Sequence, residues 1–297
     1  MKQTPYDAII ASLYPGAELQ TLMPLTGGVS ADVHRMDLRL ADGSALSLVL
    51  RAHGASHSGH SAELEYQLLQ TLHRGGLAVP ETLHFDASGG VFADPFLIMA
   101  FSEGSSAVPA GEEDAHIDTM ADVLARIHGF PTAGLPALPA RNDPLPEVFD
   151  YLPAGAEWAA LGAHLRTLSD TACQGSPKLL HGDFWPGNLL WQQGAVTAIL
   201  DWEDAALGDP LSDVACCRVE LRYRFGKARM QRFTQAYARH RPVDARRLAL
   251  WQVYVAAAAQ HFMGQWGLEA AREAHMRHEA LASIREAGAV LMGRTLR

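Results

Sequence analysis

The sequence predicts an α+β protein with a strand-rich first lobe and a larger, mainly helical second lobe. Three observations lead to this fold class: paired strand patterns near the N-terminus, helical patterns in the second half, and a Gly-, Ser- and Pro-rich connector between them. The chain has 297 residues, 48% of them hydrophobic, so it can bury a full core. We expect the lobes at residues 1–101 and 116–297, joined by a connector at 102–115.

The first lobe is predicted to be a small antiparallel sheet with a single helix, preceded by a short opening helix. The segments "VHRMDLRL" (33–40) and "ALSLVLR" (45–51) alternate apolar and polar residues on either side of "ADGS". This pattern is typical of a hairpin, and it places Arg51 on the face opposite the three leucines of its strand. Helical spacing follows over 62–76, and "ETLHFD" and "VFADPFLIMAF" (91–101) predict further strands.

The second lobe contains a long uncharged stretch, "LALWQVYVAAAAQHFMGQWGL" (248–268), without Lys, Arg, Asp or Glu. Its glutamines and histidine favour a buried helix of a globular protein over a membrane span. The proline-rich segment 131–147 is expected to be an irregular surface loop.

The net charge of −9 argues against nucleic acid or membrane surfaces as partners, because both require clustered Lys and Arg. The acidity is compatible with a cationic small molecule. The three cysteines, Cys173, Cys216 and Cys217, form no disulfide framework or metal knuckle, so a reducing cytoplasm is the simplest location. The N-terminus lacks the uninterrupted apolar core of a signal peptide. The oligomeric state is left open.

A polar loop stands between two apolar pairs in "LLHGDFWPGNLLW" (179–191), the arrangement of a site loop anchored by buried segments. Thirteen residues after Asn188, the strand-like run "AVTAIL" ends at Asp201. Pairing of that run with "NLLW" would bring Asn188 and Asp201 together at the open end of a hairpin. Two hard oxygen donors there, with substrate phosphates as further ligands, suit Mg²⁺. Asp183, five residues before Asn188, could accept a proton from an attacking alcohol.

The order H-x-D-x-x-x-x-N followed by a strand-terminal Asp resembles the catalytic and metal loops of kinases. "HGDFWPGN" with "ILDWEDAALGDPLSDVA" resembles the aminoglycoside phosphotransferase and choline kinase superfamily of small-molecule kinases. Protein kinases usually have Arg between the His and the Asp and D-F-G at the metal loop, whereas this chain has Gly182 and D-W-E. The resemblance covers nearly the whole chain. It implies a bilobal protein-kinase-like fold with a small antiparallel-sheet N-lobe and a larger helical C-lobe.

The same resemblance assigns the nucleotide site. "PLTGGVSADVHRM" (24–36) is similar to the loop that covers the phosphates, with Gly27, Gly28 and Ser30 as the contacting residues. Arg51 stands where kinases place a phosphate-holding lysine; Arg keeps the charge but has a wider planar fork. Its expected ion-pair partner is Glu65, with Glu63 as the competitor. "FLIMAFSEG" (96–104) resembles the hinge that meets the base, with the expected contacts lying from Ala100 to Ser102.

Several other residues receive structural interpretations. His181 is expected to brace the loop, while Asp209 and Asp213 should cap the next helix and hold the loop in place. Glu203 and Asp204 are left open between helix entry and contact with a substrate amine. Other residues are expected in solvated or packing positions: His53, His57 and His60 in a solvated loop, and Trp185 and Trp191 in packing, with Trp185 also within reach of an acceptor.

The function implied is an ATP-dependent O-phosphotransferase, with GTP as a possible donor and Mg²⁺ as cofactor, that acts on a small alcohol. Aminoglycosides, macrolides, choline, homoserine and sugars all remain open as acceptors, and antibiotic resistance does not follow from the motif. The alternative is a catalytically silent nucleotide-binding scaffold. A protein kinase is disfavoured because no A-P-E-like segment follows Asp201.

Overall fold

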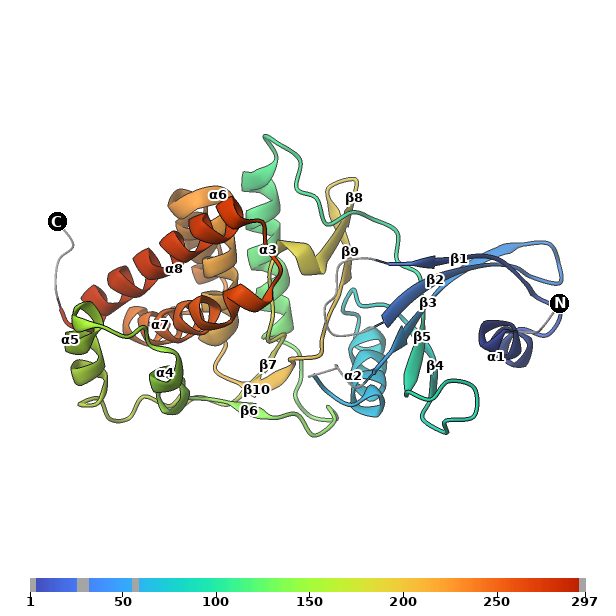
Figure 1. The fold of residues 1–297 in the computed structure, drawn as a ribbon, viewed down its shortest axis with the longest axis horizontal. Helices are drawn as coiled ribbons and strands as arrows, with labels where there is room; N and C mark the ends of the chain where they lie inside the picture. Colours follow the sequence, from blue (N-terminus) through green and yellow to red (C-terminus); the bar gives the residue numbers. More distant parts are fainter. Residues whose placement is uncertain (1–3, 26–31, 55–58, 294–297) are drawn as a thin grey trace. The chain divides into compact units, whose positions relative to one another are not determined.

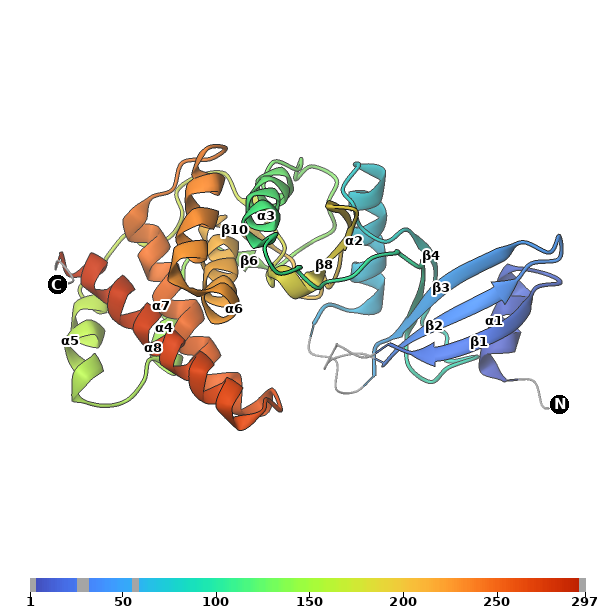
Figure 2. The same ribbon diagram turned by 90° about the horizontal axis from the view of Figure 1, so that it is seen from above.

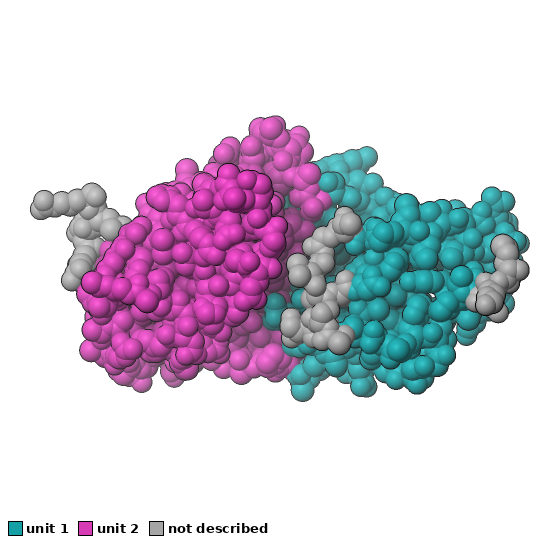
Figure 3. All heavy atoms as spheres, viewed as in Figure 1, with its two compact units in different colours: residues 1–105, 134–137, 189–204 teal, residues 106–133, 138–188, 205–297 magenta. Residues whose placement is uncertain are grey.

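The computed structural model describes residues 4–25, 32–54 and 59–293. These residues form two compact units, shown in two colours in Figure 3. Unit 1 consists of residues 1–105, 134–137 and 189–204, and unit 2 of residues 106–133, 138–188 and 205–297. Each unit has its own packed interior and is described by itself.

Unit 1 is built on a five-stranded antiparallel sheet with the strand order β1-β2-β3-β5-β4 (Figure 1). Its strands are β1 (Glu18–Pro24), β2 (Asp32–Arg39), β3 (Ala45–Ala52), β4 (Thr82–Asp86) and β5 (Phe96–Ala100). The predicted hairpin is confirmed, with Met36 paired to Leu48 and Leu38 to Leu46 across β2 and β3. Leu48 and Leu50 are buried on one face, as the alternation requires.

Two helices pack against this sheet. Helix α1 (Pro5–Leu13) begins with a capping box between Thr4 and Asp7 and lies against β1 (Figure 2). Helix α2 (Ala62–Arg74), capped by the Ser61 hydroxyl, contacts β4 and β5 and confirms the helix predicted over 62–76.

A separate hairpin completes unit 1. Strands β8 (Leu189–Gln192) and β9 (Ala195–Ile199) pair as predicted, and the turn between them has two left-handed residues, Gln193 and Gly194. The hairpin belongs to unit 1, which corrects the expectation that all residues after 115 form the second lobe. The reason is a long-range contact: Ser105 and Trp191 exchange backbone hydrogen bonds, and the Thr197 hydroxyl donates to the Glu103 carbonyl.

Unit 2 is mainly helical (Figure 1). Its helices are α3 (Glu113–Ile127), α4 (Leu145–Tyr151), α5 (Ala156–Leu165), η1 (Pro186–Asn188), α6 (Leu211–Ala238), α7 (Ala245–Phe262), η2 (Met263–Gln265) and α8 (Ala270–Leu291). Helix α6 has a kink at Gly226, whose φ is 82°. Helices α6, α7 and α8 pack together and enclose an apolar core that includes Val253 and Ile284.

A short three-stranded sheet lies beside these helices in unit 2. It has the order β6-β10-β7, from β6 (Ala140–Arg141), β10 (Ala206–Gly208) and β7 (Lys178–Leu180). Strand β7 leads directly into the polar loop singled out in the sequence, and β10 leads into α6.

Two local predictions differ from the structure. Strand β1 was not anticipated, because six of its seven residues are exposed and their alternation is weak. The strand expected over 91–101 begins only at Phe96, since residues 91–95 contain bends and Pro95, which has no N–H for a ladder. Within the described residues, none of the helices is both long and apolar enough to span a bilayer. The uncharged stretch 248–268 forms most of α7 and the short η2, and Trp251, Val253 and Ala256 in α7 are buried.

Candidate active site

Asp213 at the start of α6 holds the polar loop that follows β7. It is fully buried, and its Oδ2 and Oδ1 accept hydrogen bonds from the backbone N–H groups of His181 (2.8 Å) and Gly182 (3.0 Å). His128 Nε2 lies 3.1 Å from Asp213 Oδ2. Burial raises the pKa of Asp213, but the contacts with His128 and His181 outweigh it and leave that pKa below its usual value. The loop is therefore anchored by one buried carboxylate.

Asp209 forms a second anchor, at the entrance of α6. Its Oδ1 accepts from the Leu211 N–H, and its Oδ2 accepts from the indole of Trp251 on α7 (2.8 Å). Arg247 Nε also lies 2.8 Å from this oxygen. Both acids are therefore structural, as predicted, but in different ways. Asp209 accepts from the first N–H of α6 and contacts α7, whereas Asp213 lies inside α6 and holds the loop without capping the helix.

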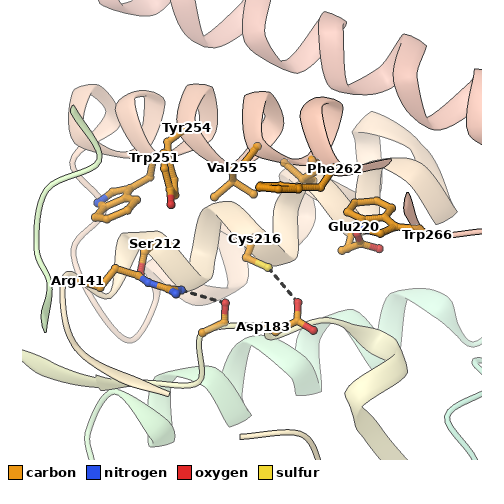
Figure 4. Close-up of a pocket in the computed structure, with 14 residues that line it drawn as sticks. Arg141, Asp183, Ser212, Cys216, Glu220, Trp251, Tyr254, Val255, Phe262 and Trp266 are labelled. Carbon is orange, nitrogen blue, oxygen red and sulfur yellow. Dashed lines mark hydrogen bonds between the residues drawn. The ribbon is translucent and has the colours of Figure 1, made fainter. Parts of the chain in front are cut away.

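The carboxylate of Asp183 is oriented by three donors. Trp185 Nε1 and Asn188 Nδ2 donate to its Oδ2, at 3.0 Å and 3.1 Å. The Cys216 thiol, one turn into α6, donates to its Oδ1 at 3.7 Å (Figure 4). His181 Nδ1 accepts from the Asp183 backbone N–H, which is the bracing role expected for that histidine. A carboxylate held this way can accept a proton in a fixed direction.

The amide orientation of Asn188 follows from the same contacts. Its Nδ2 donates both to the Asp183 carboxylate and to the Asp183 carbonyl (2.9 Å), so its Oδ1 points away from Asp183. Asn188 is buried and is the last residue of η1, directly before β8. Gly187 permits this short turn, because a Cβ there would lie 2.1 Å from the Trp185 ring.

A second charged group lies in unit 1, around Arg51. Its Nη2 donates to Asp201 Oδ1 (3.2 Å) and to Glu203 Oε2 (2.5 Å), and its Nε lies 3.5 Å from Glu65 Oε2. His53 Nε2 lies 2.7 Å from the same Glu65 oxygen. We call these five residues the Arg51 cluster. Glu63, the competing partner, instead accepts from Gln67.

The Arg51 cluster carries more acid than base, with three carboxylates around one guanidinium. Burial lowers the pKa of Arg51, but the charges of Glu65, Asp201 and Glu203 outweigh it and raise that pKa. Asp201 adopts a left-handed backbone conformation (φ 62°), which is sparsely populated outside glycine and concentrates at functional sites.

A pocket of about 240 Å³ opens beside Asp183 within unit 2 (Figure 4). Helix α7 forms one wall and α6 another, with Asp183 and Gly182 at the loop between them. The lining residues are Arg141, Gly182, Asp183, Ser212, Cys216, Val219, Glu220, Trp251, Tyr254, Val255, Ala258, Ala259, Phe262 and Trp266. Burial and the Asp183 charge raise the pKa of Glu220 to about 7.

A sequence model of the phosphotransferase enzyme family matches residues 21–251, which is most of the chain. The chain belongs to this family. Its fold is the protein-kinase-like fold of the solved structures described below.

Solved structures agree with this fold at low sequence identity. A candidate aminoglycoside phosphotransferase from Ralstonia eutropha JMP134 has a TM-score of 0.72 and 16% identity, over 98% of both chains. A thermostable variant of aminoglycoside phosphotransferase APH(4)-Ia was solved with AMP-PNP and hygromycin B. It has a TM-score of 0.66 and 19% identity, over 96% of this chain and 99% of that one. The GDP and kanamycin complex of APH(2")-IIIa has a TM-score of 0.64 and 17% identity, over 96% of this chain and 98% of that one.

The phosphotransferase also resembles part of a longer curated protein, mouse acyl-CoA dehydrogenase family member 10. The two are 29% identical over 199 residues, which make up 60% of this chain and 18% of the mouse protein. The match therefore concerns one segment of that protein.

The predicted phosphate loop and hinge of the phosphotransferase differ in how far the structure describes them. Gly27, Gly28 and Ser30 lie outside the described residues. Ala100 ends β5, with its N–H donating to the Glu81 carbonyl, and Ser102 is half-buried two residues later.

One histidine differs from its expected position. His53 is buried against Glu65 instead of lying in a solvated loop, because β3 extends to Ala52 and carries the next residue toward α2. His57 lies outside the described residues, and His60 is half-buried.

Glu203 and Asp204 lie in different environments. Glu203 pairs with Arg51, which is neither of the roles considered for it, and Asp204 is exposed. Trp191 is buried, in line with its packing role, whereas Trp185 both packs over Gly187 and donates to Asp183.

Sequence reasoning missed the wall of the pocket. Cys216, Glu220 and Trp251 were not identified, although Asp213, Cys216 and Glu220 follow one another at helical spacing and so share a face of α6. That spacing was the available signal. The apolar run of α7 predicted burial but not which residues would border Asp183.

Magnesium can be tested against the donors present. In the ranges 4–25, 32–54 and 59–293, no group of three or more His, Cys, Asp or Glu side chains has metal-binding geometry. Mg²⁺ in nucleotide sites needs only one or two protein oxygens besides phosphates and water. The Asn188 Oδ1 and the Asp201 carboxylate are oxygen donors of that kind, so these residues fit the ion.

Proposed function

We propose that this phosphotransferase moves the γ-phosphate of ATP to a hydroxyl of a small molecule, with Asp183 as the base. The observation that carries this proposal is the carboxylate of Asp183, held by Trp185, Asn188 and Cys216 at the edge of a pocket that can admit an alcohol. GTP is an alternative donor, and the complex of a structural relative with GDP supports testing it.

The proposed reaction needs no covalent intermediate with the protein. The acceptor oxygen forms a bond to the γ-phosphorus while the bond from phosphorus to the β,γ-bridging oxygen breaks, and the nucleoside diphosphate leaves. Asp183 accepts the hydroxyl proton as that bond forms and later releases it to water. The other residues position the reactants and neutralise the phosphate charge. These two effects are the main source of rate enhancement in phosphoryl transfer.

We further propose that Asn188 and Asp201 supply the protein oxygens for Mg²⁺. Asn188 directly precedes β8 and Asp201 follows β9, and the pairing of Leu189 with Ile199 supports their placement at the open end of one hairpin. When bound, the metal would neutralise the nucleotide phosphates. Arg51 would hold the phosphates, which requires its guanidinium to exchange a carboxylate of the Arg51 cluster for a phosphate oxygen.

The proposed phosphate loop, Gly27, Gly28 and Ser30, and the proposed hinge, Ala100 to Ser102, would complete the nucleotide site. These assignments rest on the family resemblance. The silent scaffold is disfavoured because Asp183, Asn188 and Asp201 are all present.

The test compares wild type with Asp183→Ala and Asp183→Asn. Transfer should fall by ~10²–10⁴-fold in both variants, while the dissociation constant for MgATP changes little. Nucleotide affinity is measured by calorimetry and transfer by detection of the phosphorylated alcohol. Wild-type transfer rates in either variant would exclude Asp183 as the base, and nucleotide binding without any transfer by the wild type would favour the scaffold.

A further inference from the structure

The wall that α7 contributes to the pocket beside Asp183 is apolar along its whole length. Trp251, Tyr254, Val255, Ala258, Ala259 and Phe262 recur every three or four residues, so they lie on one face of the helix. Figure 4 shows Trp251, Tyr254, Val255 and Phe262 in a row on the side of the pocket opposite Asp183, with Trp266 beyond them.

The polar atoms of the two inner aromatic residues are already bonded to protein groups. Trp251 Nε1 donates to Asp209, and the Tyr254 hydroxyl donates to Glu147 Oε2 on α4 at 2.7 Å. The half-buried Tyr254 therefore offers ring carbon to a ligand, while Trp251, which is 1% exposed, packs behind it. Rings of this kind bind apolar surface well and leave a hydrated polar group without a partner.

The charges in the pocket are few and largely committed. Asp183 must remain available for the reacting hydroxyl, and Arg141 Nη1 donates to the Gly182 carbonyl. The remaining carboxyl is Glu220, whose pKa is raised to about 7 by burial and by Asp183, so it is only partly ionised at neutral pH. Arg224 and Arg272 lie near enough to act on its charge.

A polycationic aminosugar needs several carboxylates to replace the water around its ammonium groups, because burying an unpaired charge is costly. The pocket offers one partly ionised acid for that purpose, together with a guanidinium that repels cations. Its composition opposes a polycation and favours an uncharged body.

Two aromatic side chains at the end of this wall point to the same class of ligand. Phe262 and Trp266 are each 37% exposed, although large aromatic side chains are usually more deeply buried. The Tyr151 ring packs against Phe262, with ring centroids 5.3 Å apart. An apolar ligand that filled the pocket would cover both rings.

We propose that the acceptor is an alcohol with an uncharged, hydrocarbon or aromatic body, which packs against Tyr254, Phe262 and Trp266 while its hydroxyl meets Asp183. This inference rests on the proposed function. It separates the chain from the aminosugar specificity of the structural relatives that were solved with hygromycin B or kanamycin.

The experiment measures binding and transfer for three probes with the wild-type protein: 2-phenylethanol, choline and kanamycin. Binding is followed by calorimetry with a nonhydrolysable ATP analogue and Mg²⁺, and transfer by mass detection with MgATP. We expect 2-phenylethanol to have the highest affinity and a kcat/KM at least ~10-fold above that of either cation. Preference for kanamycin or choline in binding or in transfer would overturn the inference.

Matched variants locate the effect. Phe262→Ala should weaken 2-phenylethanol ~10-fold and Phe262→Leu much less, with the affinity for the ATP analogue unchanged in both. Val290→Ala removes another exposed apolar side chain, from α8 and outside the pocket, and should change the affinity for neither ligand. Equal weakening of 2-phenylethanol by Phe262→Ala and Val290→Ala would contradict the proposed contact.

The two proposals fail in different ways. Binding of 2-phenylethanol, sensitive to Phe262→Ala, without transfer to any probe would refute the proposed function and support the apolar ligand class. Efficient transfer to kanamycin that depends on Asp183 would support the proposed function and refute the apolar class. Absence of binding by 2-phenylethanol would overturn the inference whatever the transfer result.

Discussion

Replacement of Asp213 by Asn removes the charge that anchors the Asp183 loop while keeping the side-chain shape. In the folded protein this carboxylate accepts from two backbone N–H groups and contacts His128. Asn has one acceptor oxygen and would direct its NH₂ group at a donor. Breaking a buried, charge-assisted network costs about 3–5 kcal/mol, out of a total stability of ~5–15 kcal/mol. Asp213→Asn should therefore lose a large fraction of its free energy of unfolding.

The effect on the free energy of unfolding should depend on pH. The pKa of Asp213 is lowered in the folded state, so its stabilisation is fully present above the unfolded pKa of ~4 and is lost as pH falls through the folded pKa. The difference between wild type and Asp213→Asn should be constant from about pH 5 to 8 and shrink in stronger acid.

Urea unfolding followed by circular dichroism measures this difference. Asp204→Asn is the matched control, since Asp204 is exposed and close by in sequence, and it should leave the unfolding midpoint unchanged. Two outcomes would refute the reasoning: a stability of Asp213→Asn equal to that of the control, or a difference that grows as the pH is lowered.

Three further predictions concern packing, charge and phosphate binding. Gly208→Ala would place a Cβ 1.9 Å from a backbone carbonyl oxygen of β6, so the free energy of unfolding in urea should fall by ~1–3 kcal/mol. Gly175→Ala, whose Cβ would have its nearest atom at 3.7 Å, should be tolerated, and equal stabilities of the two variants would contradict the close contact. The pKa of Glu220 is raised in the folded state, so its contribution to the free energy of unfolding is present below the unfolded pKa and is lost as pH rises through about 7. Between pH 5 and pH 8 the free energy of unfolding of Glu220→Gln should therefore gain ~1–3 kcal/mol relative to that of wild type. A difference in this free energy that does not depend on pH would contradict this. Arg51→Lys keeps a cation but loses the fork that reaches both Asp201 and Glu203, so steady-state kinetics should show a KM for ATP raised ~10-fold with a smaller change in kcat; a loss confined to kcat would argue against phosphate holding.

The sequence was sufficient where the signals are local. The hairpin of β2 and β3 follows from alternation around a D-G turn, and the pairing of β8 with β9 follows from two apolar runs around Gln193 and Gly194. The loop of Asp183 was identified because its polar residues interrupt an apolar stretch at a motif spacing. In these segments the local pattern and the tertiary structure agree, which is the ordinary condition for a foldable sequence.

Long-range packing decided what the sequence could not predict. The β8–β9 hairpin joins unit 1 through Ser105 and Glu103, which lie far away in the chain. The thiol of Cys216 reaches Asp183 only because Asp213 draws the loop onto α6. Periodicity predicts that α7 is buried, but the choice of Trp251 and its neighbours as a pocket wall depends on how helices pack.

The most direct test of the account is transfer itself. Purified protein is incubated with MgATP and an excess of alcohol, and the products are followed by mass spectrometry alongside the release of ADP. The account predicts one phosphoryl group added to the alcohol for each ADP formed, with both signals lost in Asp183→Ala. ADP formation that continues in Asp183→Ala, or wild-type ADP release without any phosphorylated alcohol, would contradict it.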